Sequence, residues 1–106
     1  MEVEFSNYKT RVHMSEWAYV YVMLPTTGYE KNVTAIRMED EYKIYVAEVA
    51  LNIIAPINIS SDLKFYLNGS GFKTTEDWYN TYKELYDKKH MYLYNVEVLE
   101  QYEFTR

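Results

Sequence analysis

Two basic side chains near the N-terminus have the spacing needed to hold a phosphate backbone. Alternating apolar and polar residues at the start of the chain predict a strand over residues 3–14. Lys9 and Arg11 are two positions apart and would project from the same face of that strand. Both can make charge-assisted contacts to phosphate, and Trp17 or a nearby tyrosine can stack on an unpaired base. The alternative is that the two cations are solvated side chains that protect a strand edge from aggregation.

The residue types that most often carry catalysis or hold a metal ion are few and scattered. The chain has no cysteine, and its two histidines, His13 and His90, are far apart in the sequence. A protein metal site needs three or four ligands, so neither histidine predicts one. The acidic residues 39–41 indicate a solvated turn, because sequence neighbours do not converge on one cation without a shaped loop. No serine lies in a nucleophile elbow, so we expect a non-catalytic protein without metal or cofactor.

The composition bounds the classes of partner. The chain has 106 residues and a net charge of −5, so we expect a single domain over residues 1–106 that repels nucleic acid at long range. Binding to DNA or RNA would therefore require a local basic patch. Tyrosine is unusually frequent, with 13 residues, and suits either a packed sheet or an exposed interface. The sequence leaves both uses of tyrosine open.

No segment has the features of a signal peptide or a membrane span. The N-terminus is acidic and lacks an apolar stretch. The most apolar run, residues 46–59, is interrupted by Glu48, Asn52, Pro56 and Asn58 and is too short to cross a bilayer. We therefore expect an intracellular, cytoplasmic protein with no membrane partner.

A helix that follows a glycine-containing bend at residues 68–71 is expected to organise the fold. Thr74 is a good N-cap, and Asp77 three residues later completes an approximate capping box. Four residues then recur at helical spacing and predict one buried face: Trp78, Tyr82, Leu85 and Tyr86. Basic residues at 88–90 suit the C-terminal end of the helix. This should be the only long helix, with Trp78 as a core anchor rather than a ligand-stacking ring.

Strand-like patterns occupy most of the remaining sequence. Strands are predicted at residues 17–24, 33–38, 42–51 and 91–98, and the last can extend towards residue 106. Pro56 predicts a bend after the strand at 42–51, followed by a return segment. Ser60 or Ser61 can cap a single helical turn at residues 62–67. Because tight turns favour antiparallel pairing, we expect an α+β fold. It would be a small curled antiparallel or mixed sheet, or a β-barrel, of about five strands with one long and one short helix.

Four segments in the second half of the chain follow one another in a characteristic order: residues 45–49, 57–63, 71–78 and 91–98. They are a strand, a short helical turn, a Gly-Phe bend that opens a helix with a tryptophan, and a closing strand. In this order, over roughly the last sixty residues, the chain resembles the ASCH/PUA-like superfamily. The resemblance implies a small β-barrel that binds RNA.

The resemblance also adds residues to the predicted nucleic-acid site. Lys9 and Thr10 match part of a family segment whose preceding helix and glycine are not predicted here. The same resemblance implies that Arg37, Lys73 and Gly71 lie near the mouth of the barrel. The predicted site then consists of Lys9, Thr10, Arg11, Trp17, Arg37, Gly71 and Lys73. The amidohydrolase activity of some members is not implied, because Val12 stands where they have a threonine and the bend has no carboxylate.

Two functions of different classes follow from these observations. The first is a domain that binds RNA or single-stranded nucleic acid in a groove beside the bend at residues 69–72. The alternative is a protein-interaction or inhibitor module, for instance a viral protein that acts on a host factor. The acidic charge and any exposed tyrosines favour this alternative, which also includes a homodimer. A hydrolase acting on a modified nucleoside comes third, since the missing carboxylate disfavours it.

Overall fold

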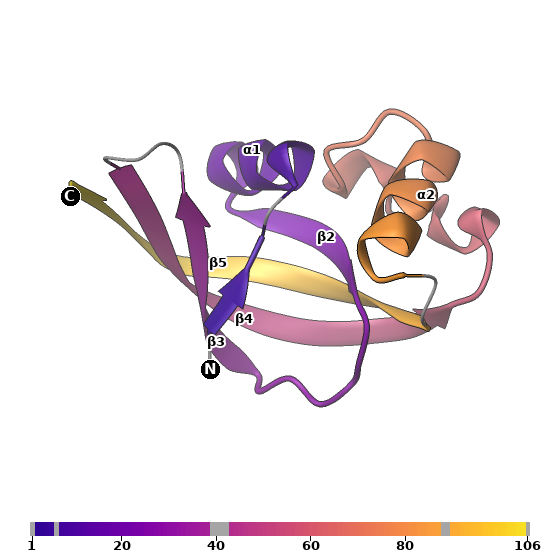
Figure 1. Ribbon diagram of the computed structural model, residues 1–106, viewed down its shortest axis with the longest axis horizontal. Coiled ribbons are helices and arrows are strands. Elements are labelled where there is room, and N and C mark those ends of the chain that lie inside the picture. The colour runs from indigo at the N-terminus through magenta and orange to yellow at the C-terminus, as the bar shows by residue number, and fades with distance from the viewer. Residues whose placement is uncertain (1, 6, 39–42, 88–89, 106) are drawn as a thin grey trace.

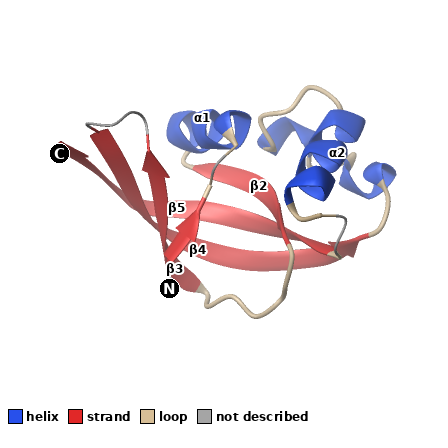
Figure 2. Ribbon diagram, in the orientation of Figure 1, coloured by secondary structure: helices blue, strands red, loops and turns tan. Residues whose placement is uncertain are grey.

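The fold is a curved sheet with its helices on one side (Figure 1, Figure 2). The computed structural model describes residues 2–5, 7–38, 43–87 and 90–105, with the backbone alone at residues 2, 4, 36–38, 43–45 and 103–105. The strands are β1 (Glu2–Glu4), β2 (Tyr19–Leu24), β3 (Asn32–Met38), β4 (Lys43–Ile57) and β5 (Met91–Thr105). The helices are α1 (Tyr8–Trp17) and α2 (Thr75–Leu85), with 3-10 turns η1 (Ser60–Leu63) and η2 (Leu67–Gly69) between β4 and α2. The α+β class predicted from the sequence is confirmed.

The sheet has the strand order β1-β3-β4-β5-β2. β1 runs parallel to β3, and the other three pairings are antiparallel. β4 and β5 are 15 residues long and form the central ribbon of the sheet. β3 pairs with the first half of β4, and β2 pairs with the first half of β5, so the sheet is staggered. The predicted extension of the last strand beyond residue 98 is confirmed as far as Thr105.

The predicted bend and return at Pro56 are wrong, because β4 continues through Pro56 as a single strand to Ile57. β3 pairs with β4 only as far as Ala50, so at Pro56 β5 is the sole strand neighbour in the described part of the sheet. A proline is tolerated where its missing N–H faces an unpaired edge. A register shift between Ile53 and Ala55 takes up the local irregularity.

The predicted strand over residues 3–14 is also wrong: β1 is three residues long, and residues 8–17 form α1. The Asn7 side chain accepts a hydrogen bond from the Thr10 backbone N–H at 3.1 Å and caps the helix. Thr10 and Met14, four positions apart, form the buried side of α1. α1 has 10 residues and α2 has 11, so the prediction that α2 is the only long helix is wrong. Trp17 belongs to α1, and the strand predicted from residue 17 begins at Tyr19.

α2 begins as the sequence predicts. The Thr74 hydroxyl accepts a hydrogen bond from the Asp77 N–H at 3.1 Å, and Trp78 is fully buried. The helix ends earlier than predicted, at Leu85, whose side chain is 50% exposed and does not continue the buried face. Asp87 follows with a φ of 54°, which turns the chain towards β5. The cations predicted to close the helix at 88 and 89 lie outside the described residues, as does the predicted acidic turn at 39–41.

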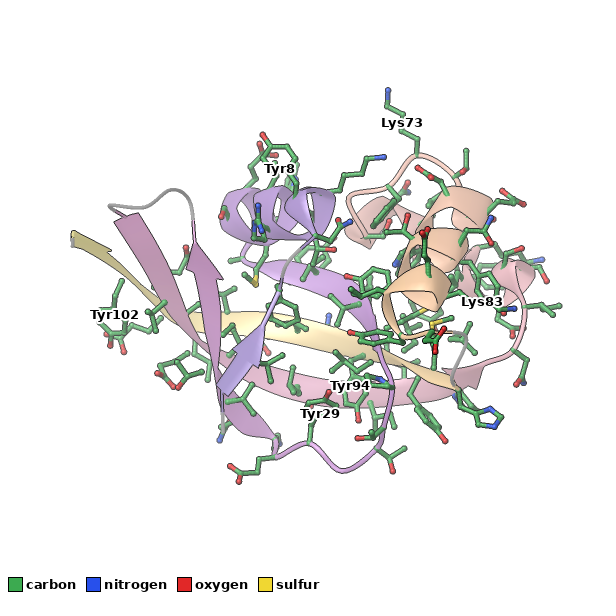
Figure 3. All side chains as sticks on the ribbon, viewed as in Figure 1. Tyr8, Tyr29, Lys73, Lys83, Tyr94 and Tyr102 are labelled. Atoms are coloured by element: carbon green, nitrogen blue, oxygen red, sulfur yellow. The ribbon has the colours of Figure 1, made fainter. Side chains whose placement is uncertain are left out.

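The core lies between the sheet and the layer of helices. Its fully buried apolar side chains come from β2, β4, β5, η1 and α2, and the largest are Trp78, Met23, Leu63 and Leu93. Most tyrosines join this core or pack along its border, in edge-to-face ring pairs such as Tyr29 with Tyr94 (Figure 3). Among the described tyrosines only Tyr8 and Tyr102 are exposed, so packing is their main use here. No helix within the described ranges is long and apolar enough to span a bilayer.

Candidate binding surface

A hollow of about 260 Å³ lies between α1 and the glycine bend, and it contains part of the site predicted from the sequence. Its lining comes from one side of α1 together with the bend: Tyr8, Lys9, Val12, His13, Glu16 and Gly71. We call it the α1 hollow. Tyr8, Val12 and Glu16 lie four positions apart, and Lys9 and His13 form a neighbouring row, so both rows face the same side of the helix.

Gly71 brings the bend into contact with α1. Its φ is +85°, in the left-handed region that favours glycine. A Cβ at this position would meet the carbonyl oxygen of Lys9 and would lie 3.2 Å from the His13 Cβ. Because both the backbone conformation and the close approach require glycine, Gly71 fixes one wall of the hollow.

Lys9 is held by α2 rather than left free in the hollow. Its Nζ lies 3.1 Å from the Asp77 carboxylate oxygen Oδ2 and 5.1 Å from the centroid of the Phe72 ring. Both partners of the ion pair are about half exposed, so the pair is a surface interaction worth about 0–1 kcal/mol. Asp77 nevertheless offsets the positive charge of Lys9 locally, so the pair contributes no net positive charge to the hollow.

Thr10 is a core residue and cannot contact a ligand in the hollow. Its side chain is fully buried, and its Oγ1 lies 2.7 Å from the Tyr82 hydroxyl in a hydrogen bond. Burial raises the pKa of Tyr82, so this hydroxyl is neutral at any physiological pH. The predicted role of Thr10 in nucleic-acid binding is therefore replaced by a structural one, joining α1 to α2.

Neither Arg11 nor Lys73 gathers with Lys9 in the hollow. On a helix, residues two positions apart point about 200° apart, so the prediction that Lys9 and Arg11 share a face is wrong. Arg11 donates from Nη1 to the carbonyl oxygen of Phe5 at 3.5 Å, away from the hollow. Lys73 is exposed and points outward from the bend (Figure 3). Arg37 is on β3, and its side chain lies outside the described part of the structure.

Aromatic side chains flank the α1 hollow. Trp17 is 64% exposed, and its ring stacks on His13 with 6.2 Å between ring centroids. From His13 a row of edge-to-face rings continues along the sheet through Tyr19, Tyr21 and Tyr66. Tyr8, 69% exposed, points to solvent at the start of α1 (Figure 3). Trp17 is thus exposed beside the hollow, at the end of a helix rather than on the strand that the sequence predicts.

His13 is the imidazole that lines the hollow. Its Nε2 is buried and has no hydrogen-bond partner in the described ranges. Burial lowers the pKa of His13, although the nearby Glu16 carboxylate opposes the shift, so the ring is neutral at pH 7. With Lys9 offset by Asp77 and with Glu16 in the lining, the hollow has no excess of positive charge.

Sequence reasoning found Lys9, Gly71 and Trp17 but missed Tyr8, Val12, His13 and Glu16 as members of one surface. The signal that could have found them is the i, i+4, i+8 spacing of Tyr8, Val12 and Glu16, which has meaning only if the segment is a helix. Asn7 at the position of a helix N-cap was the local indication of that helix.

Comparison of the chain with protein-family models, with curated proteins and with solved structures finds no significant match in any of the three. The resemblance to the ASCH/PUA-like superfamily therefore stays a prediction from the sequence. The functional argument rests on the geometry of the chain itself.

Proposed function

We propose that this protein is a non-catalytic protein-interaction domain whose partner docks over α1 at the α1 hollow. The observation that carries the proposal is the exposure of two large aromatic side chains, Tyr8 and Trp17, beside a hollow of mixed charge. Tyrosine and tryptophan are enriched among the residues that dominate the binding energy of protein interfaces. An inhibitor that binds another protein, such as a viral protein acting on a host factor, is one form of this function.

The charge distribution favours a protein partner over a nucleic acid. The net charge is −5, and binding to phosphate requires several unpaired lysines or arginines on one surface. Lys9 is offset by Asp77, and Arg11 is directed to the Phe5 carbonyl. A protein partner needs no such cluster, because apolar and aromatic burial supplies most of its affinity.

A double substitution, Tyr8→Ser with Trp17→Ser, tests the proposal. The wild-type protein is immobilised on a resin and incubated with nuclease-treated extract of the cells that express it. It should retain a discrete protein, and the double variant should retain at least tenfold less of that protein. Loss of about 1.4 kcal/mol, which truncation of one interface aromatic commonly exceeds, gives that factor. Phe65→Ser is the matched control, because Phe65 is 83% exposed yet lies outside the α1 hollow. Equal capture by wild type and the double variant would contradict the proposal.

Single-stranded nucleic acid is the second candidate, and the α1 hollow gives it one supporting observation. Lys9 and Gly71 line this hollow, and Lys73 is two residues from Gly71. The exposed Trp17 ring, which stacks on His13, could also stack on a base bound next to the hollow. Labelled single-stranded RNA should then shift at low salt, and Lys73→Glu should weaken the shift while Lys31→Glu should not. Absence of any shift at low salt removes this candidate.

Membership of the ASCH/PUA-like superfamily is part of the same proposal. The order of β4, η1, the glycine bend, α2 and β5 matches the order that the resemblance implies. A helix is present in the first half, contrary to expectation, but α1 contains Lys9 and Thr10 instead of preceding them. The described strands form an open sheet, so closure into a barrel is a proposal as well.

A further inference from the structure

Within the described part of the sheet, the C-terminal half of β5 has a strand neighbour on one side only. β4 pairs with β5 as far as Thr105, whereas β2 pairs with β5 only as far as Glu97. The Val98 N–H donates to the Ala18 carbonyl at 2.9 Å and is the last contact of this kind on that edge among the described residues. Residues 99–105 therefore present an open edge, and Figure 1 shows this end of β5 running out past β2 and α1.

The open edge is long enough for a complete strand. Seven residues at about 3.3 Å each span roughly 23 Å, and a typical strand has five or six residues. Natural proteins protect such an edge with proline, charged side chains, above all lysine, or a β-bulge. Residues 98–105 contain no proline or lysine, and their protection is limited to acidic side chains and the register shift at Leu99. Leu99, which the register shift leaves without a partner on β4, is 57% exposed.

The side chains beside this edge are acidic. Glu97 and Glu100 are exposed on β5, and Glu48 lies directly across from Glu100 on β4. The pKa of Tyr102 is raised, first by its hydrogen bond to the Glu100 carboxylate and also by the charges of Glu100 and Glu48. In Figure 3, Tyr102 and Lys83 lie at opposite ends of the molecule, so the positive charge of Lys83 is far from this edge. A strand that pairs here is therefore favoured if it carries positive charge.

We propose that the open edge of β5, residues 99–105, binds an extended segment of another protein that is rich in lysine or arginine and adds to the sheet as a further strand. Main-chain hydrogen bonds would give affinity, and Glu97 and Glu100 would select for basic side chains. A second copy of the chain fits less well, because both copies carry a net charge of −5 and the same acidic row. This inference deepens the proposed protein-interaction function but uses a surface separate from the α1 hollow, so each can fail alone.

The test uses a peptide of alternating valine and lysine, with blocked ends and the length of the open edge, and measures amide hydrogen exchange of the full chain. Alternate amides between 99 and 105 should become at least tenfold more protected, while amides of β2 should not change. Two peptides serve as controls: one with glutamate in place of lysine, and one with alternate N-methyl amides that cannot pair along an edge.

Protein variants separate this site from the α1 hollow. Glu97→Gln with Glu100→Gln should weaken peptide binding about fivefold, as expected for the loss of exposed charge pairs, with thermal unfolding unchanged. Tyr8→Ser with Trp17→Ser should bind the peptide like wild type. No protection by the lysine peptide, or equal protection by the N-methyl peptide, would overturn the inference. Protection in the protein alone that rises with protein concentration would assign the edge to a second copy and would also overturn it.

Discussion

Position 71 makes two demands on the backbone that no amino acid other than glycine meets. Its φ of +85° strains any side chain, and a Cβ there would collide with the Lys9 carbonyl oxygen. Gly71→Ala should therefore lower the free energy of unfolding by about 2 kcal/mol, measured by urea denaturation. Gly28→Ala is the matched control, because a Cβ at Gly28 would meet only the Thr26 hydroxyl, at 3.7 Å. A change there within about 0.5 kcal/mol is expected, and equal losses at the two glycines would contradict this account.

Buried tyrosines make stability depend on alkaline pH. Burial raises the pKa of Tyr86 to about 12 from the ordinary value of 10.0, with the nearby Tyr29 adding to the shift. The unfolded chain therefore loses this proton first. The stabilising contribution is complete below pH 10 and is lost as the pH rises from about 10 through 12. The more deeply buried Tyr82 has its pKa raised in the same direction.

The variant Tyr86→Phe isolates the contribution of Tyr86 to that decline. Urea denaturation at a series of alkaline pH values should show a shallower fall in unfolding free energy for the variant than for wild type. Near neutral pH the unfolding free energies of the two proteins should depend on pH to nearly the same extent. An identical alkaline decline in both would mean that Tyr86 does not ionise later in the folded state than in the unfolded chain.

At the scale of elements, one buried hydrogen bond joins the two helices. Thr10 on α1 and Tyr82 on α2 share it at 2.7 Å. Thr10→Val should cost about 1–2 kcal/mol of unfolding free energy, because the Tyr82 hydroxyl is left buried and unpaired. Thr81→Val is the control, since that hydroxyl bonds the Asp77 carbonyl on the surface of α2 and its loss should cost no more than about 0.5 kcal/mol.

The double variant Thr10→Val with Tyr82→Phe completes a cycle for this bond. Thr10→Val leaves the Tyr82 hydroxyl without this partner, and Tyr82→Phe leaves the Thr10 hydroxyl with only its 3.4 Å hydrogen bond to the Asn7 Oδ1. The double substitution removes both hydroxyls. The cost of the double variant should fall short of the sum of the singles by on the order of 1 kcal/mol. Strict additivity would show that the two helices are not coupled through these groups.

Elements with strong local signals could be predicted from the sequence, and α1 could not. α2 has both an N-cap at Thr74 and an apolar stripe, and the sequence located its start correctly. The buried side of α1 consists of Thr10 and Met14, so one polar residue breaks the apolar pattern, and its partner Tyr82 is distant in the sequence. The continuation of β4 through Pro56 was likewise missed, because it depends on β3 pairing with β4 only from Asn32, opposite Ala50.

The candidate site was predicted only in part for the same reason. Lys9 and Gly71 do lie together, because the bend packs on α1. Arg11 was assigned to the same face on strand geometry and lies elsewhere once the segment is a helix. The error in this one element therefore misplaced Thr10, which is buried, and Arg11, which is directed to the Phe5 carbonyl.

At the scale of the whole molecule, the protein is an elongated acidic domain with candidate surfaces on different elements. Its extents are 40 × 26 × 25 Å, and the long axis follows the β4–β5 ribbon. The α1 hollow lies on the helical side of the sheet, whereas the open edge lies at the far end of β5. A net charge of −5 acts against phosphate-rich partners at both surfaces.

The most direct test of the central claim is photo-crosslinking from the α1 hollow itself. A benzophenone side chain replaces Tyr8, or as a control the exposed Thr27 in the loop after β2, in the full chain expressed in its own cells. Irradiation should produce a discrete adduct from position 8 and none from position 27, and the adduct should resist nuclease but disappear with protease. An adduct that nuclease removes, or equal yields from the two positions, would contradict a protein partner docked over α1.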